Sequence, residues 1–461
     1  MPYGDVPARS RGIEGAAAAT FLSNPLATLP LGVSLRDTAA LTLCHHPSDH
    51  LTASLLTAAE VGRGGRQHTG RHILLLRNGL GRAGVQTLRE VAGVRLGLSP
   101  DFDRSTPGHE VAAGEGTLFH RVGAALVQID PDQLAALRRQ RGKTLVSIEA
   151  ERGFRISHAP KCSGVAPGRD GPVGGTGSEA QATWGLETTG VTRSRFSGRG
   201  VRVAILDTGL DLEHPDFAGR PVVSQSFING ATVDDRHGHG TYCAGIACGP
   251  RSPAQAPRYG IACDAALYVA KVIDDHGSGT DGSILAGMDW AVRNGCSIVS
   301  LSMGTPVGPG EPHSVVYEQV AQRAQAAGTL ILAAAGNDSV RPDAIAPVDH
   351  PANCPSIWAV AAIDEHRRIA PFSCGGINAN GGEVNIAAPG VAIRSAWCRP
   401  ALYRNDSGTS MATSCVAGIA ALLAEANPQV RGRDLLALLA KGAQPLPFPA
   451  RDVGAGLIQT T

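Results

Sequence analysis

The sequence lacks both a charge excess and long apolar runs. It contains 41 Lys and Arg against 40 Asp and Glu, which leaves a formal net charge of only +1 at pH 7. Proteins that attract nucleic acid or anionic membranes usually carry a basic excess, so we expect neither partner. The longest apolar stretches, such as residues 330–335, are as long as a strand. A helix that spans a bilayer needs about 20 apolar residues, and no membrane segment is expected.

The sequence also has no signal-peptide pattern and no CxxC motif. Residues 1–5 read MPYGD, with neither a basic n-region nor an unbroken apolar h-region after them. This predicts a cytoplasmic protein. Ten cysteines are spread irregularly between Cys44 and Cys415. Because a chain of this length can bury a large core without disulfides, free buried thiols are expected, and disulfides are the alternative if the protein is exported.

Composition and periodicity divide the chain into four segments. Residues 1–70 show no sustained periodicity and predict a poorly ordered leader without an assigned function. Residues 71–153 predict a small α+β, ferredoxin-like domain of order β-α-β-β-α-β. Residues 154–182 are rich in Gly and Pro and predict a linker. The small domain would have strands at 72–76, 94–98, 124–129 and 144–148, and helices at 85–92 and 130–140.

Residues 183–461 form the largest predicted domain, in which apolar strands alternate with helices. This order predicts an α/β fold with a parallel sheet and helices on both faces. In such sheets the catalytic and binding residues usually lie at the carboxyl ends of the strands. The expected strands are 201–206, 266–273, 297–301, 329–334 and 357–362, and the expected helices are 240–247, 283–294, 315–327, 414–426 and 432–441.

Ser410 is the first candidate for chemistry. It lies in the segment NDSGTSMAT, residues 405–413, directly before a run of Ala, Gly and Leu. It should therefore lie in the first turn of a helix, where free backbone N–H groups and the helix dipole favour a developing anion. A serine hydroxyl becomes a good nucleophile only with a base, a group that orients the base and an oxyanion donor.

Asp207, His239 and Asn337 are candidates for those three roles. Asp207 and Asn337 each follow a predicted strand, and His239 precedes a small-residue helix. Taken singly, each has an ordinary explanation as a turn, cap or structural residue. Together they can orient an imidazole, accept the serine proton and donate to an oxyanion. His237, two residues earlier, is the competing base.

Seven segments resemble those of the peptidase domain of the subtilases, the subtilisin-like serine peptidases, and occur in the same order as in that family. Their residues are most similar to those of proteinase K-like members. The resemblance covers residues 183–458. It implies that Asp207 orients, that His239 is general base and then acid, that Ser410 attacks, and that Asn337 and the Ser410 N–H form the oxyanion hole. The matching segments are ILDTGLD (205–211), HPD (214–216), HGTYCAG (239–245), DDHGSG (274–279), AAGN (334–337), APG (388–390) and GTSMAT (408–413).

The resemblance also implies how a substrate binds. Two segments would hold an extended peptide as an added strand, and small residues would leave an open pocket for the residue before the cut. Broad specificity with an apolar preference is expected. The implied substrate-binding residues are Ser278, Gly279, Ser302, Met303, Gly304, Ala334, Ala335 and Gly336.

Two departures from the family weaken the expectation of calcium. Residues 249–253 replace the Asn-rich loop that usually follows the histidine helix, and Asn385 stands where relatives often have a ligating Asp. Because the number of carboxylates sets calcium affinity, we expect no cofactor, no assigned metal ligand and at most weak calcium binding.

Residues 71–153 resemble the inhibitor-type propeptide of these peptidases, by pattern and not by a specific motif. The expected protein is a serine endopeptidase made as a self-processing precursor, with a protein or peptide substrate and its own propeptide as inhibitor. The C-terminal strand of the propeptide-like segment should direct residues 153–159 into the active-site cleft. The alternatives are a dedicated precursor-peptide maturation peptidase or ligase, an inactive binding protein on the same fold, and a permanently attached N-terminal domain.

Overall fold

The computed structural model describes residues 68–77, 81–98, 115–156 and 182–460. All of them belong to one compact unit, residues 63–461. The expected leader, except for residues 68–70, and most of the expected linker lie outside the described residues, so the proposed division into four segments remains a prediction.

Residues 68–155, the N-terminal subdomain, form an open-faced sandwich. Its strands are ordered β2-β3-β4-β1-β5 in the sheet. Leu74, Leu88 and Leu137 are fully buried in a core of their own. The elements are β1 (His68–Leu76), α1 (Gly81–Ala92), β2 (Arg95–Leu98), β3 (Glu115–Phe119), β4 (Ala124–Val127), α2 (Pro131–Arg138) and β5 (Leu145–Arg155).

The predicted order β-α-β-β-α-β is one strand short, because β3 was not expected. Its sequence Glu-Gly-Thr-Leu-Phe is short and contains glycine, which weakens the local strand signal. Pairing decides its conformation: β3 is parallel to β2 and antiparallel to β4. Helix α2 is encoded locally, since Asp130 and Gln133 form a capping box and Pro131 is the first helical residue.

Residues 182–460, the C-terminal domain, are built on a parallel sheet of order β13-β12-β11-β10-β6-β8-β7. All five expected strands are present, and β7 and β13 extend the sheet at its two edges. The strands are β6 (Arg202–Asp207), β7 (Val222–Ser226), β8 (Ala266–Lys271), β10 (Ile298–Leu301), β11 (Leu330–Ala334), β12 (Trp358–Ile363) and β13 (Val384–Pro389).

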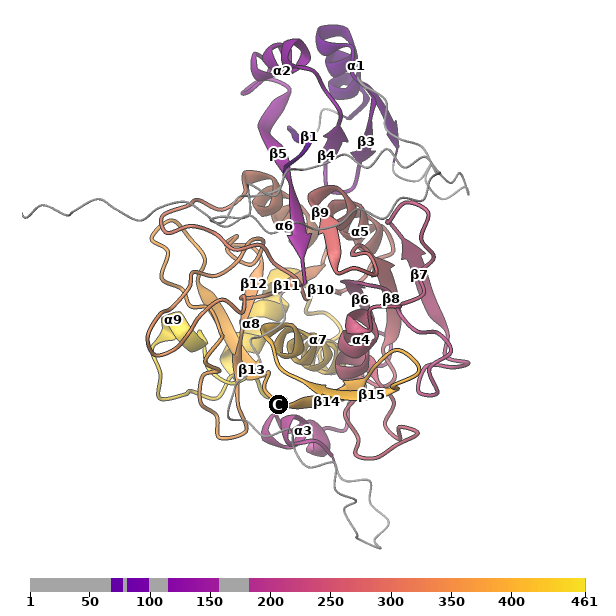
Figure 1. Ribbon diagram of the computed structural model, residues 1–461, viewed down its shortest axis with the longest axis vertical. Coiled ribbons are helices and arrows are strands. Elements are labelled where there is room, and N and C mark those ends of the chain that lie inside the picture. Colours follow the sequence, from indigo (N-terminus) through magenta and orange to yellow (C-terminus); the bar gives the residue numbers. More distant parts are fainter. Residues whose placement is uncertain (1–67, 78–80, 99–114, 157–181, 461) are drawn as a thin grey trace, which may run out of the picture. The chain divides into compact units, whose positions relative to one another are not determined.

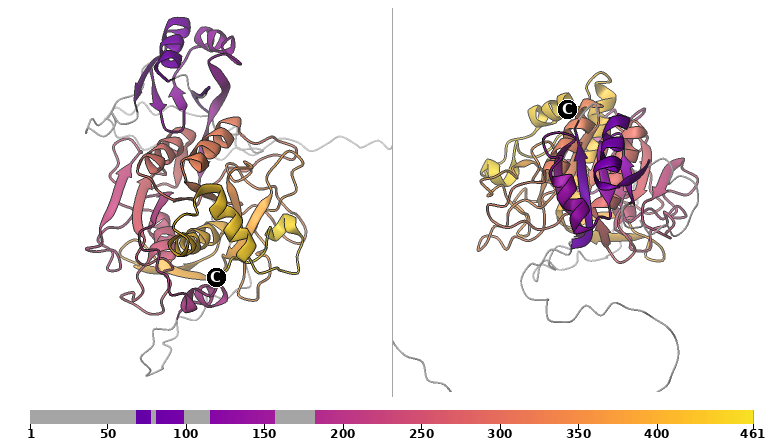
Figure 2. Two further views of the ribbon diagram at one scale, coloured as in Figure 1. Left: turned by 180° about the vertical axis from the view of Figure 1, so that it is seen from behind. Right: turned by 90° about the horizontal axis from the view of Figure 1, so that it is seen from above.

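Helices cover both faces of this sheet, as predicted (Figures 1 and 2). Helices α4 (His239–Cys248) and α7 (Thr409–Ala426) pack together on one face, and α5 (Asp281–Arg293) and α6 (Val315–Ala326) lie on the other. The remaining elements are α3 (Trp184–Thr188), η2 (Val191–Arg193), β9 (Ser278–Thr280), β14 (Ile393–Ala396), β15 (Tyr403–Asp406), α8 (Gly432–Gly442) and α9 (Ala450–Val453).

Helix α7 is long and apolar enough to span a membrane by composition, with a mean hydropathy of 1.4. Its 18-residue window is 89% buried inside the domain, which is typical of the core helix of a folded domain. It begins at Thr409, earlier than the predicted residue 414, so Ser410 lies in its first turn as expected.

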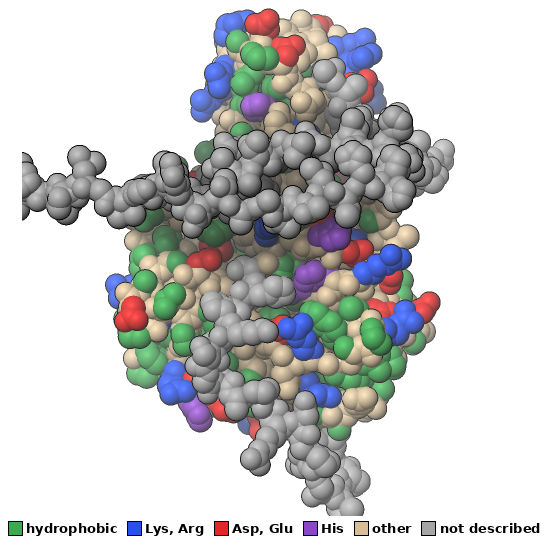
Figure 3. All heavy atoms as spheres, viewed as in Figure 1, with side chains coloured by type: hydrophobic (Ala, Val, Ile, Leu, Met, Phe, Trp, Pro, Cys, Tyr) green, Lys and Arg blue, Asp and Glu red, His purple; other side chains and the backbone are tan. Residues whose placement is uncertain are grey.

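Surface charge and cysteine chemistry agree with the composition. Figure 3 shows basic and acidic side chains interspersed over the described part of the face in view. The eight cysteines in the described part of the chain are all free thiols, and all but Cys263 are buried. The expectation of free thiols is met by these eight, and the expectation of burial by seven of them.

Strand β5 joins the two parts of the structure. Its end pairs antiparallel with β9, with Phe154 opposite Gly279 and Arg155 opposite Ser278 (Figure 1). Arg155 also forms a bridge to Gly304, and the Ile156 N–H donates to the Gly277 carbonyl at 2.9 Å. Residues 153–156 therefore lie along the segments expected to hold a substrate, whereas residues 157–159 lie outside the described residues.

Charged side chains of β5 bind the N-termini of helices α5 and α6. Arg152 donates from its backbone N and its Nε to Asp281 Oδ2, at 2.8 and 3.0 Å. Glu151 accepts from the Gly282 N–H at 2.9 Å, in the first turn of α5. Glu149 accepts from the Val316 N–H at 2.9 Å, in the first turn of α6. Carboxylates are stabilised at helix N-termini, where N–H groups have no partner within the helix.

We expect Arg152→Met, made in an uncleaved Ser410→Ala chain, to destabilise the structure strongly. Breaking a buried ion pair by removing one partner costs about 3–5 kcal/mol, because the Asp281 charge stays buried. Calorimetric unfolding measures the effect. Arg95→Met is the control, because the Arg95–Glu115 pair is exposed and should cost no more than about 1 kcal/mol. Equal shifts in the two variants would contradict the role of Arg152.

Candidate active site

The structure brings Asp207 and His239 together in a buried contact. Asp207 ends β6 and His239 begins α4. His239 Nδ1 lies 2.8 Å from Asp207 Oδ1 and 3.0 Å from Oδ2. The carboxylate therefore fixes the Nδ1–H tautomer and leaves Nε2 to accept a proton. This contact selects His239 over the competing His237. Cys243 lies beside the ring, with Sγ 3.8 Å from Nδ1.

Asp235, which sequence reasoning missed, holds the two loops of this pair in place. Its Oδ1 accepts from Thr208 Oγ1 at 2.9 Å and from the Gly238 N–H at 2.8 Å. Its Oδ2 accepts from the N–H and Oγ1 of Thr241, at 2.8 and 2.7 Å. One buried carboxylate thus links the residue after Asp207 to the start of α4. In the sequence, only its position four residues before His239 pointed to this role.

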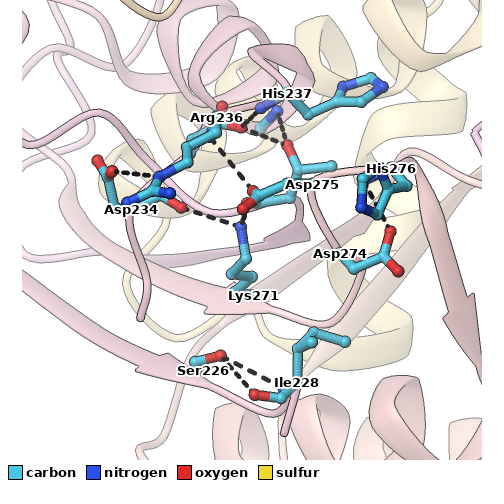
Figure 4. A network of polar contacts seen from close by, with 12 residues as sticks. Ser226, Ile228, Asp234, Arg236, His237, Lys271, Asp274, Asp275 and His276 are labelled. Atoms are coloured by element: carbon cyan, nitrogen blue, oxygen red, sulfur yellow. Dashed lines mark hydrogen bonds and ion pairs between the residues drawn. The ribbon is translucent and has the colours of Figure 1, made fainter. Parts of the chain in front are cut away.

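Lys271 was missed as well, because a lysine at a strand end usually extends into solvent. Here it is fully buried and lies opposite Asp207 in the β6–β8 register. Its Nζ donates to the carbonyls of Thr208 and Asp234, at 2.6 and 2.9 Å, and to Asp275 Oδ1 at 2.5 Å. Figure 4 shows this ammonium beneath the loop that carries Arg236 and His237.

Ser410 lies in the first turn of α7 and is 4% exposed. Its hydroxyl donates to the Ser302 carbonyl at 2.9 Å. Among the described residues this bond, and not one to His239, is its hydrogen bond. Contacts of this kind often align only once substrate is bound, and a rotation of the Ser410 side chain would release the hydroxyl.

Asn337 is oriented by the residue before the serine. Its Oδ1 accepts from the Thr409 N–H at 2.9 Å and from Thr409 Oγ1 at 3.0 Å. Because the amide oxygen is held by these two donors, its Nδ2 is the end that can donate to an oxyanion. Asn337 follows β11 by three residues, at the carboxyl end of the sheet where the sequence predicted it.

The expected substrate-binding residues occupy two sides of the same region. Ser278 and Gly279 lie in β9, Ser302, Met303 and Gly304 directly follow β10, and Ala334, Ala335 and Gly336 lie at or just after the end of β11. Gly279 and Gly304 already pair with β5 residues, which shows that their backbones can hold an extended chain.

Two groups of side chains have the spacing to hold a metal ion. They are Asp207, His239 and Cys243, and Asp338, Asp349 and Cys374, each with ligand atoms within 4.8 Å of one another. The first group is the acid–base pair itself. Asn385 accepts from the Ala359 N–H at 2.7 Å, so its amide oxygen has a structural bond.

Known proteins of similar sequence and structure were found. Residues 198–456 match the model of the Subtilase family. Subtilisin DY from Bacillus licheniformis is 35% identical over 244 residues, covering 52% of this chain and 83% of that protein. Subtilisin E from Bacillus subtilis (strain 168) is 35% identical over 245 residues, covering 52% and 60%. The solved structure of sphericase aligns with a TM-score of 0.53 and 29% identity, covering 62% of this chain and 99% of that one.

Activity should fall on acidification at a pH above the ordinary titration of histidine. Burial opposes protonation of His239, but the carboxylate of Asp207 outweighs it and raises the pKa of His239 well above 6.5. The base must be neutral to accept the serine proton, so kcat/KM should drop as the pH falls through this raised value. Rates measured from pH 5 to 10 test this, with Asp207→Asn expected to move the acid limb down. If the acid limb of the pH profile stays in place in Asp207→Asn, the assignment of His239 as the base paired with Asp207 is wrong.

Asn337→Leu should lower kcat about 100- to 1000-fold with little change in KM. The amide is used mainly once the oxyanion forms, so its loss affects the transition state more than substrate binding. Steady-state kinetics on one peptide substrate measure both constants. A change confined to KM would show that Asn337 only shapes the turn.

Proposed function

The chain belongs to the subtilase family of serine endopeptidases, and we propose that it is made as a precursor that cuts its own chain just after β5. The observation that carries this proposal is the pairing of Phe154 and Arg155 with β9 and Gly304. The chain's own segment occupies the place expected for a substrate strand.

The geometry supports acyl transfer from Ser410. The Ser410 Oγ attacks the peptide carbonyl while its proton passes to His239 Nε2, and Asp207 stabilises the imidazolium through Nδ1–H. The oxyanion would accept from Asn337 Nδ2 and the Ser410 N–H. His239 then gives the proton to the leaving amine, which departs and leaves an acyl-enzyme. Water, deprotonated by His239, hydrolyses the ester and frees Ser410.

The register of β5 favours a cut close to Ile156. Arg155 is opposite Gly304 in an antiparallel sense, so each further residue would face one residue earlier in the segment 302–304. Continued by two residues, this register reaches Ser302, whose carbonyl accepts from the nucleophilic hydroxyl. We therefore propose a cut within about three residues after Ile156.

After the cut, the N-terminal subdomain would act as an inhibitor that stays bound. Its contacts to α5 and α6 do not depend on the bond being cut, since Glu149, Glu151 and Arg152 all precede it. Residues 157–181 contain many Gly and Pro, and such a sequence gains little by staying docked.

Several finer expectations stay predictions. They are the apolar preference before the cut, the weakness of any calcium binding and the cytoplasmic location. A dedicated maturation peptidase or ligase would use the same four residues, and so would a peptidase with a permanently attached N-terminal subdomain. The intact set Asp207, His239, Asn337 and Ser410 disfavours an inactive binding protein.

Ser410→Ala should abolish both processing and casein hydrolysis, while the wild type splits between residues 156 and 183. Loss of the nucleophile in this family costs on the order of a million-fold in turnover. Intact mass and N-terminal sequencing of the purified proteins give the result. Ser407→Ala, three residues earlier and just before α7, is the control and should still be processed.

Two outcomes would count against self-processing. Equally intact wild-type and Ser410→Ala chains would rule it out, and equally clipped chains would assign the cut to a host protease. Casein hydrolysis by Ser410→Ala above about a hundredth of the wild-type rate would refute the serine assignment itself.

A further inference from the structure

Asp349 lies directly behind two glycines of the substrate-binding segments. A Cβ atom added to Gly304 would lie 2.9 Å from Asp349 Oδ2, and one added to Gly336 would lie 2.7 Å from the same oxygen. Gly336 also has a φ of +110°, which strongly favours glycine. The two glycines therefore leave room for one carboxylate between the segment after β10 and the segment after β11.

No Lys, Arg or His in the described ranges forms an ion pair with this carboxyl group. Asp349 is 2% exposed, and its Oδ1 is buried without a hydrogen bond in the part of the chain that the structure describes. Its close side-chain neighbours are Asp338 and Cys374, an acid and a thiol. Buried carboxylates are normally paired or hydrogen-bonded; Asp281, for example, has Arg152. Burial, and then the charge of Asp338, raise the pKa of Asp349 well above its ordinary value.

The proposed path of a substrate runs past the two segments that cover this carboxyl group. Arg155 pairs with Gly304, and a substrate strand continued in this register would face Ser302, whose carbonyl accepts from the Ser410 hydroxyl. The residue whose carbonyl is attacked must lie between Ser302 and Asn337, if the nucleophile and the oxyanion donor are both to be used. The two segments that flank its side chain are then those of Gly304 and Gly336, with Asp349 behind them.

We propose that Asp349 selects a Lys or Arg side chain in the residue immediately before the bond that is cut. The inference rests on the proposed endopeptidase function and is the alternative to the apolar preference that the small residues predict. A substrate ammonium or guanidinium would supply the missing counter-charge and hydrogen bonds. An apolar side chain would supply neither, so Asp349 would stay in the protonated form that its raised pKa favours.

A bound metal ion is the other cation that this group could hold. A thiol binds a metal as its thiolate, and burial together with the Asp349 charge raises the pKa of Cys374, which opposes that form. A metal ion would require both Cys374 and Asp349 to lose their protons, whereas a side-chain cation requires this only of Asp349.

The self-cut does not need this selection. Ser157, His158 and Ala159 follow Ile156, and none is Lys or Arg. A tethered segment already docked on β9 reaches the nucleophile at a high effective concentration, so no side-chain affinity is required. Selection by Asp349 applies to separate substrates.

The test compares fluorogenic peptides that differ only in the residue before the cut, namely Arg, Lys, Leu and Phe. For the self-processed wild type, kcat/KM for Arg or Lys should exceed that for Leu at least about 10-fold. Asp349→Asn should lower the Arg/Leu ratio about 100-fold, the size expected when a buried charge loses its partner. Asp343→Asn, an exposed carboxylate nearby, is the control that should keep the ratio.

Benzamidine, an arylamidine cation, tests the wild type without any variant and should inhibit it competitively. A wild type that prefers Leu or Phe, an Arg/Leu ratio unchanged in Asp349→Asn, or inhibition by zinc but not by benzamidine would overturn the inference while leaving the proposed function standing. A wild type that neither cuts any peptide nor reacts with a fluorophosphonate would refute the proposed function itself.

Discussion

The buried contact between Asp207 and His239 is the interaction on which the active site depends, and it requires two separate elements to meet within a hydrogen bond. Asp207 is placed by the β6–β8 register and His239 by the start of α4. Asp235 binds both loops through side-chain and backbone donors, and Lys271 binds the carbonyl after Asp207. The catalytic pair is therefore held by a second layer of buried charges, which limits its freedom to move.

Buried charged side chains also hold the N-terminal subdomain in place. Glu149 and Glu151 accept from N–H groups in the first turns of α6 and α5, where helices have donors to spare. Arg152 neutralises Asp281 at the start of α5. These bonds precede the docked residues 153–156 in the chain. The subdomain can thus bind the enzyme and align the strand at once, since β5 carries both sets of contacts.

Asp349 differs from the other buried carboxylates discussed, because no cation among the described residues pairs with it and its Oδ1 has no hydrogen bond there. In a low-dielectric site an unpaired charge is costly, and natural proteins accept such costs mainly where a ligand is expected. The residue lies behind two glycines that pack against it, on the side where substrate passes. A site that is incomplete without a cation is the natural explanation for a carboxylate in this position.

Strand and helix signals determined much of this protein locally. Apolar runs predicted five sheet strands, and small-residue runs predicted α4 and α7. The segments around Asp207, His239, Asn337 and Ser410 were recognisable because each of these residues lies in a short motif of its own. The tertiary structure alone decided the rest. Strand β3 forms because β2 and β4 pair with it. Lys271 and Asp235 both bind Thr208, which is distant from each of them in the chain. Asp349 lies beside Gly304, 45 positions earlier in the sequence, so no local pattern could show that a carboxyl group lies behind this glycine.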